Sequence, residues 1–242
     1  MECWPCQNVY SVIDLTDYNN KSLYHSGIPY IFKVKFCNDN IYSVIDLTDY
    51  NNKSLYHSGI PYIFKSNQKR ATLVDIMNVY SANKEIFDRD ASRVKSTNKN
   101  IRNIKDLLNY SKNCTKSSSN HISWRINRMT PARIIRTLFP RPQIISEWSG
   151  QSVERYIMID EPNAPHHVLP SFECSYIFVI QGSGQQTIIL KPTQECSGTC
   201  RTVSVILKPS YVLWYNWWYW RPISLPMANA TETSVSYINS YC

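Results

Sequence analysis

Short apolar runs, each closed by glycine, proline or serine, fill the last third of the chain between Ser171 and Pro226. The runs are rich in β-branched and aromatic side chains, which suit the pleated, half-buried surface of a β-strand. A cysteine-containing loop divides them into residues 171–184 with 187–192 on one side and residues 202–209 with 211–222 on the other. The pattern predicts a β-rich core in which two halves of a small barrel face each other.

A helical spacing precedes this region. Apolar residues recur at i, i+3, i+4 and i+7 from Leu73 to Tyr80, which predicts an amphipathic helix over residues 71–80. Further helices are expected over residues 103–110 and from Thr130 to Phe139, where Thr and Pro favour a helix start and Pro140 favours an end. Residues 153–160 are expected to form a strand that enters the barrel. We therefore expect an α/β N-terminal region over residues 42–150 and a β-barrel core over residues 151–242.

The N-terminal region contains an unchanged duplication, because residues 10–33 recur as residues 42–65. Structural repeats normally drift while they keep their buried and turn positions. Full identity instead indicates a recent segmental duplication or an assembly error. Only the second copy adjoins the rest of the domain, so we expect residues 1–41 to be a duplicated segment that is surplus to residues 42–65.

The order of the barrel segments resembles the Jumonji C (JmjC)/cupin-like family of the Fe(II)/2-oxoglutarate oxygenase superfamily. The resemblance lies in Gly182-Ser-Gly184, Ile189-Leu-Lys-Pro192, Pro209-Ser-Tyr-Val-Leu213 and Asn216-Trp-Trp-Tyr219. It implies an α+β fold in which a double-stranded β-helix of the cupin or jelly-roll type follows a helical N-terminal region. In that family one strand carries a His-x-Asp/Glu motif, and a later Trp-Trp-His motif supplies a second histidine.

This chain departs from the family where the metal ligands would stand. Counting back from the Gly-rich turn places Ser171 and Glu173 at the His-x-Asp/Glu positions, and Tyr219 at the position of the distal histidine. An iron oxygenase site needs two imidazoles and a carboxylate on one face of the ion. No histidine lies C-terminal to His167. The resemblance therefore implies a degenerate metal site in which only the carboxylate is kept.

Two alternatives stay open around this site. A slipped register would make His166, His167 and Glu173 an alternative metal site, although neither histidine has an acidic residue two positions later. The family also has a lysine that pairs with the cosubstrate, and its nearest counterparts here are Gln186 and Lys191. We expect a non-catalytic binding or structural module without catalytic residues or cofactor. The alternative is an Fe(II)/2-oxoglutarate-dependent hydroxylase or demethylase with a rearranged site.

Eight cysteines, an even number, allow disulfide bonds in an oxidising compartment. Zinc is the competing use of Cys3-x-x-Cys6 and Cys196-x-x-x-Cys200, but no second pair at zinc-finger spacing with histidine completes either set. We expect a local disulfide between Cys196 and Cys200, or free thiols.

The sequence also bears on the compartment. No apolar run reaches the roughly 18 to 20 residues that span a bilayer, and no signal-peptide pattern stands at the N-terminus. These features predict a soluble chain without a transmembrane segment. An incomplete N-terminus together with the cysteines would favour a secretory compartment.

The net charge of +8 lies entirely in the middle of the chain. Residues 66–150 contain 16 Lys and Arg against 6 Asp and Glu, whereas residues 1–65 and 151–242 each contain 5 against 6. Such a region can attract an acidic protein or a non-specific polyanion, or it can be a solvated helical face. No nucleic-acid motif accompanies the charge, so the pattern leaves the partner unknown.

Overall fold

The structure of the 242-residue chain is a computed structural model, and it describes residues 3, 6, 9, 13–14, 59–113, 119–142, 145, 149–225 and 230–242. The N-terminal region contains β1 (Ile13–Asp14), β2 (Tyr62–Lys65), α3 (Leu73–Ala82), α4 (Lys84–Asp90), β3 (Val94–Ser96), α5 (Ile104–Asn113), β4 (His121–Ile126) and α6 (Met129–Ile135). The barrel region contains β5 (Gln151–Asp160), β6 (His167–Val168), β7 (Tyr176–Ser183), β8 (Gln186–Pro192), η2 (Gln194–Cys196), β9 (Val203–Leu207), β10 (Tyr211–Asn216), β11 (Trp220–Leu225) and β12 (Ser234–Tyr241).

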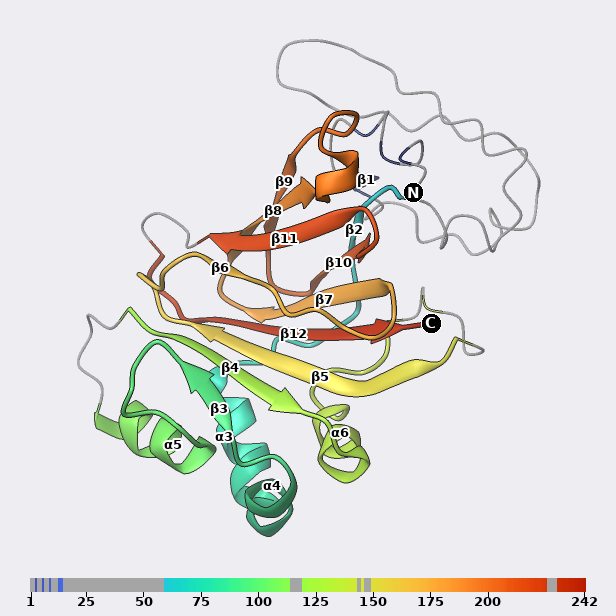
Figure 1. The fold of residues 1–242 in the computed structure, drawn as a ribbon. Helices are drawn as coiled ribbons and strands as arrows, with labels where there is room; N and C mark the ends of the chain where they lie inside the picture. Colours follow the sequence, from blue (N-terminus) through green and yellow to red (C-terminus); the bar gives the residue numbers. More distant parts are fainter. Residues whose placement is uncertain are drawn as a thin grey trace.

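The strands form two sheets that face each other (Figure 1). The large sheet has the order β1-β2-β10-β7-β12-β5-β4-β3, and the small sheet has the order β6-β11-β8-β9. From β5 onward all pairings are antiparallel, and strands that follow one another in sequence mostly lie in opposite sheets. This order is that of a double-stranded β-helix. The predicted α+β fold with a β-helix barrel and a helical N-terminal region is confirmed.

The helices cover the outer face of the large sheet, where strand residues that point away from the barrel meet them. Helix α3 confirms the helix predicted over residues 71–80, and it buries Ile76 and Tyr80 in this outer core. Its start is fixed by a capping box, in which Thr72 and Asp75 each accept a backbone hydrogen bond from the other. Alternate residues of the central strand β7 belong to two different cores. Phe178 and Ile180 pack in the outer core beneath the helices, whereas Ile177 and Val179 face the barrel interior.

The other predicted elements are present with shifted ends. Helix α5 includes the predicted residues 104–110, and β5 includes the predicted strand 153–160. Helix α6 begins at Met129 and ends at Ile135, so it is shorter than predicted, and a turn continues the chain to Phe139. Helix α4, the antiparallel strands β3 and β4, the short strand β6 and the last strand β12 were not among the predicted elements.

The Gly-rich turn lies where β7 passes into β8, and two of its glycines are required by close backbone contacts. Gly184 has φ of +62°, and a Cβ there would lie 2.7 Å from Cα of Ser234. A Cβ on Gly182 would lie 2.5 Å from the carbonyl oxygen of Ala71, whose amide donates a hydrogen bond to the Gly182 carbonyl. Glycine is therefore needed so that the chain preceding α3 and the start of β12 can both lie against this turn.

Three disulfides gather at one end of the barrel, which we call the disulfide end. They join Cys3 to Cys196, Cys6 to Cys200 and Cys174 to Cys242. The expected local bond between Cys196 and Cys200 is wrong, because each of these cysteines bonds to an N-terminal partner more than 190 residues away. The amide of Cys200 donates a hydrogen bond to the carbonyl of Cys196, so one turn of chain presents both sulfurs to the N-terminal segment.

The N-terminal segment is thereby fixed against the barrel. Cys6 and Val9 are buried in the inner core with residues of both sheets, among them Ile63, Ile188 and Leu213. Strand β1, which belongs to the first copy of the duplication, pairs in parallel with β2 at the end of the second copy. The remainder of both copies up to Ser58 lies outside the described residues, so the proposed domain boundaries stay a prediction. No helix in the described part of the chain is long and apolar enough to cross a membrane.

Candidate functional site at the Asp160 end of the barrel

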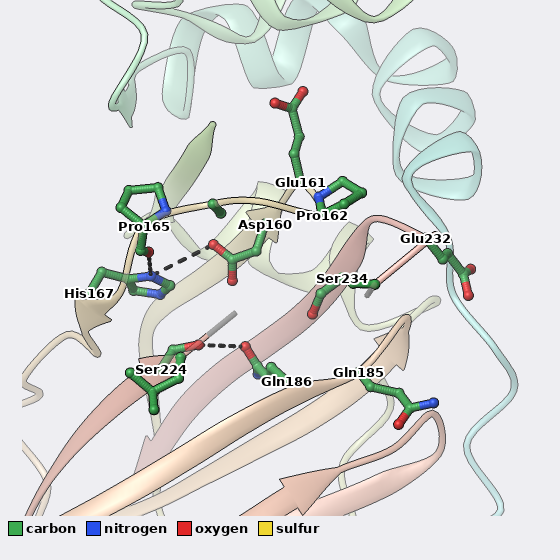
Figure 2. Close-up of a pocket in the computed structure, with 13 residues that line it drawn as sticks. Asp160, Glu161, Pro162, Pro165, His167, Gln185, Gln186, Ser224, Glu232 and Ser234 are labelled. Atoms are coloured by element: carbon green, nitrogen blue, oxygen red, sulfur yellow. Dashed lines mark hydrogen bonds and ion pairs between the residues drawn. The ribbon is translucent and has the colours of Figure 1, made fainter. Parts of the chain in front are cut away.

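A pocket opens at the end of the barrel opposite the disulfides, which we call the Asp160 end. Strand β5 ends there at Asp160, while β6 begins at His167, β8 begins at Gln186 and β12 begins at Ser234. The two sheets therefore contribute side chains from both sides (Figure 2). The pocket is lined by Asp160, Glu161, Pro162, Ala164, Pro165, His167, Gln185, Gln186, Ser224, Leu225, Ala230, Glu232 and Ser234.

Asp160 lies between two histidines, one on the adjacent strand β4 and one on β6 of the small sheet. Its Oδ1 lies 2.6 Å from Nδ1 of His121 and 3.7 Å from Nδ1 of His167. The two imidazole rings stack on each other, with centroids 3.6 Å apart and planes inclined by 22°. Pairing of β4 with β5 places His121 directly opposite Asp160, and pairing of β6 with β11 places His167 opposite Ser224. Sheet hydrogen bonds thus fix the backbone positions of all three side chains.

Several buried polar atoms around the pocket have no hydrogen-bond partner. They include Oδ2 of Asp160, Nε2 of His167 and Nε2 of Gln186. Ser224 donates to Oε1 of Gln186 at 3.0 Å (Figure 2), and Oδ1 of Asp160 faces His121, so the other ends of these two side chains are engaged. Leaving a buried polar group unpaired costs about 1–3 kcal/mol. Unpaired polar atoms that share one pocket therefore make it a candidate site for a polar ligand.

The deeper side of the same end is also polar. Gln181 on β7 donates to the carbonyl of Ser183 and to Oγ of Ser234, while its own Oε1 is buried without a partner. Ser236 on β12 lies opposite Gln181 in the sheet, and its buried Oγ likewise has no partner. The polar surface therefore continues from Asp160 into the barrel.

The charge of the pocket is negative. Asp160, Glu161 and Glu232 line it, and its lining residues include no lysine or arginine. Glu232 pairs with Arg70 at the exposed rim, and Glu161 accepts a hydrogen bond from the amide of Asn120 at 2.7 Å. Burial is the main cause that lowers the pKa of His167, with the Asp160 carboxylate acting in the opposite direction. The site therefore favours neutral or positively charged groups over anions.

The residues that the resemblance placed at a degenerate metal site lie at the disulfide end. The amide of Leu169 donates to the carbonyl of Pro222, so the chain after β6 runs toward the beginning of β11 and away from Asp160. Ser171 and Glu173 are exposed in the connection from β6 to β7, and Tyr219 is half-buried in the turn from β10 to β11. Ser171, Glu173 and Tyr219 thus lie at the opposite end of the barrel from the polar pocket.

The other candidate residues divide between these two ends. Gln186 lies in the pocket, whereas Lys191 is exposed near the opposite end of the same strand. His167 lies beside Asp160, but His166 is exposed. Among the described residues, two groups of three possible ligands have atoms within 4.8 Å of one another: His121 with Asp160 and His167, and Cys6 with Cys196 and Cys200, which are in disulfides. Neither group includes Glu173.

Sequence reasoning singled out His167 and Gln186 but not their partners. Asp160 is the last residue of a predicted strand, and His121 begins a strand that was not predicted. The sequence separation of 39 residues conceals that they are cross-strand neighbours. The signal that could have found them is a histidine and an aspartate at matching ends of two adjacent strands, but it requires the register of β4 against β5.

Comparisons with known proteins give one family and several distant structures. The family described as "C6orf89 C-terminal domain" matches residues 3–235, while no curated protein matches the chain in sequence. Among solved structures, YcfD, a ribosomal oxygenase from Escherichia coli, is similar with a TM-score of 0.46 and 12% identity over 76% of this chain and 48% of that chain. A Bacillus subtilis oxalate decarboxylase has a TM-score of 0.32 and 10% identity over 51% of this chain and 26% of that chain.

The chain matches about half the length of the Escherichia coli protein. One structure of that protein is a complex with cobalt and succinic acid, with a TM-score of 0.33 and 12% identity over 54% of this chain and 33% of that chain. The strand order described above, and not these likenesses, identifies the double-stranded β-helix.

Proposed function

This chain belongs to the C6orf89 C-terminal domain family, and we propose that its barrel is a non-catalytic binding module that takes a small polar ligand at the Asp160 end. The ligand is neutral or positively charged and hydrogen-bonds to Asp160, His167 and Gln186. The observation that carries the proposal is the set of buried polar atoms without partners on these three residues.

The donors and acceptors define the chemistry of this ligand. Asp160 Oδ2 accepts, Gln186 Nε2 donates, and Nε2 of His167 takes either role according to its protonation. A primary amide or an amine offers donors to the carboxylate, and an amide also offers a carbonyl to Gln186. The enclosed space is only about 10 Å³, close to what one water molecule needs, so the pocket suits an ion or the polar tip of a small group that enters from its open side.

Iron chemistry of the oxygenase type does not fit the position that the family resemblance implies. A serine hydroxyl and a neutral phenol are poor ligands for Fe(II), since imidazole and carboxylate are the groups that such sites use. Ser171 and Glu173 are moreover exposed, so they lack the enclosed surroundings of a catalytic ion. We therefore derive no step through iron at Ser171, Glu173 and Tyr219.

The experiment records side-chain amide signals in two-dimensional ¹H–¹⁵N spectra during titration with acetamide, methylammonium and succinate. We expect acetamide or methylammonium to shift the amide signals of Gln181 and Gln186 and to leave those of Gln68 and Gln194, which do not line the pocket, unchanged. Succinate should shift neither pair, because three carboxylates line the pocket. A response to succinate alone would contradict the proposed ligand class, and no response to any of the three would contradict the binding function.

A second candidate is an Fe(II)/2-oxoglutarate-dependent hydroxylase or demethylase with a rearranged site. The observation that favours it is the composition of the cluster at the Asp160 end, since two imidazoles and a carboxylate are the ligand set of such enzymes. The absence of lysine and arginine from the pocket lining weighs against it, because 2-oxoglutarate is a dianion. Succinate formation from 2-oxoglutarate in the presence of Fe(II), abolished by His167→Gln but not by His166→Gln, would establish this second function.

A further inference from the structure

We propose that His121, Asp160 and His167 form a binding site for one divalent transition-metal ion, of the zinc or cobalt type. The inference deepens the proposed binding function, because the ion would lie at the wall of the same pocket. It concerns different residues, at the other end of the barrel, from those that the family resemblance implies. The ligand set would be two imidazole nitrogens and one carboxylate oxygen.

The three side chains already converge. Their possible ligand atoms all lie within 4.8 Å of one another, and the Asp160 carboxylate is the common neighbour of both imidazoles. Each residue belongs to a different strand, namely β4, β5 or β6, and the sheet holds each backbone position. Strands are more rigid supports than loops, so the site does not need to be assembled from mobile parts.

The buried charge argues for a cation. The side chain of Asp160 is only 9% exposed, and those of His121 and His167 are 14% and 13% exposed. Oδ1 of Asp160 faces the two histidines, while Oδ2 has no partner at all. An ionised carboxylate is costly to bury unless a positive charge compensates it. Because the pocket lining offers no lysine or arginine, a bound cation is the compensation that this chemistry favours.

The ligand types narrow the choice of ion. Imidazole suits zinc, copper, iron, cobalt and nickel, whereas calcium and magnesium prefer oxygen ligands alone. Three protein ligands leave one or more positions of the ion free, as in catalytic and ligand-binding sites and unlike closed structural ones. The free positions would face the pocket, where Gln186 and Ser234 lie.

One rearrangement is required, and it is a small one. The imidazole rings stack face to face, so at least one must turn about its Cβ–Cγ bond before both rings aim a nitrogen at the same ion. This torsion has a broad energy profile in histidine. The competing account is that the three residues form only a hydrogen-bonded structural cluster, in which His121 donates to Asp160 and His167 packs against the pair.

Titration with cobalt(II) distinguishes the metal site from the structural cluster. The full chain is first treated with a chelator, and the buffer contains no reducing agent, so that the disulfides stay closed. We expect visible d–d absorption that saturates at one ion per chain, without the near-ultraviolet charge-transfer band that thiolate ligands would give. Asp160→Asn and His167→Gln should each weaken binding at least about tenfold, while the exposed neighbour variant His166→Gln should bind like the unmodified chain.

The proposal fails if the unmodified chain binds no cobalt, or if Asp160→Asn and His167→Gln bind it unchanged. Circular dichroism of each variant establishes that it is folded, and His121→Gln provides a further ligand variant if either of the first two does not fold. If acetamide shifts the signals of Gln181 and Gln186 but cobalt does not bind, the metal site is refuted and the proposed binding function stands. If cobalt binds but these signals do not shift, the metal site stands and the proposed binding of a small polar ligand is refuted.

Discussion

His121 and Asp160 lie opposite each other on β4 and β5, and the ring nitrogen Nδ1 of the histidine is 2.6 Å from the carboxylate of the aspartate. Strand β4 belongs to the N-terminal region and β5 to the barrel. The contact therefore joins the two regions at the wall of the pocket, beside a second histidine from the small sheet.

Removing this contact should destabilise the protein. His121→Ala leaves the buried Asp160 carboxylate with only the more distant His167, so we expect a loss of about 1–3 kcal/mol in the free energy of unfolding. Urea denaturation in the presence of a chelator measures it. His166→Ala is the matched control, since its exposed side chain should change the stability by no more than about 0.5 kcal/mol. Equal effects of both changes would refute a stabilising role for the contact.

The Gly-rich turn offers a second matched pair. Gly184→Ala places a Cβ against the backbone of Ser234 at a residue with positive φ, so we expect a loss of at least about 1–2 kcal/mol. Gly198→Ala adds a Cβ that meets nothing within 4 Å, and it should be close to neutral. Thermal unfolding distinguishes the two. A neutral Gly184→Ala would mean that β12 can move away from the turn at little cost.

Deleting residues 10–41 should leave a folded protein of equal or slightly higher stability. The two copies are identical, so the deletion joins Val9 to Tyr42 and supplies Ile45–Asp46 in the place of β1, with Cys3 and Cys6 retained. The connection between β1 and β2 shortens from 47 to 15 residues, which lowers the closure entropy by up to about 1 kcal/mol. Chemical denaturation of both chains tests this. A loss of several kcal/mol would show that both copies are built into the core.

The capping box of α3 predicts a specific pH dependence. Hydrogen bonds from the Thr72 backbone and hydroxyl are the main causes that lower the pKa of Asp75 below its usual value. The ionised carboxylate therefore stabilises the folded state above the pKa of the unfolded chain, and this contribution is lost as the pH falls through the folded-state pKa.

The matching variant is Asp75→Asn. It should be less stable than the unmodified chain by about 0.3–1 kcal/mol at pH 7, and the gap should close as the pH falls below about 4. Urea denaturation at a series of pH values provides the measurement. A gap that does not change with pH would mean that the charge of Asp75 contributes nothing.

The basic region over residues 66–150 should bind polyanions weakly and without sequence preference. Binding to a random-sequence DNA duplex should fall steeply between low and physiological salt, since it depends on the release of counterions. Arg133→Glu, an exposed change on α6, should weaken the binding, whereas Arg201→Glu, outside the region, should have little effect. Binding that persists at high salt, or that differs between base sequences, would instead indicate a specific nucleic-acid module.

The elements that could be predicted are those whose spacing of apolar residues can be read within one short segment of the chain. The spacing of Leu73, Ile76 and Tyr80 is enough to place α3, because one face of the helix meets the core. Strand β12 was missed because it reads Ser-Val-Ser-Tyr-Ile-Asn-Ser-Tyr, and its polar residues are buried only through its central place in the large sheet. Local pattern carries no information on which strands become neighbours.

The site was harder to predict for the same reason. The cluster of His121 with Asp160 and His167 depends on two strand registers, and the pairing of Cys196 with Cys3 depends on the return of the N-terminus to the barrel. A single sequence shows neither the strand registers nor the position of the N-terminal segment against the barrel. The Gly-rich turn and the apolar runs around it predicted the correct barrel, but the family resemblance placed the metal-site positions at Ser171 and Tyr219, at its other end.

The disulfides also determine how the chain carries mechanical load. Cys3 is bonded to Cys196 and Cys242 to Cys174, so a force applied between Cys3 and Cys242 is transmitted through these bonds. The backbone in series between these two bonds runs from Cys174 to Cys196 and contains β7 and β8, which lie in different sheets. The helices α3 to α6 lie outside this load path. While these disulfides are closed, extension under such a load is limited to the residues between Cys174 and Cys196.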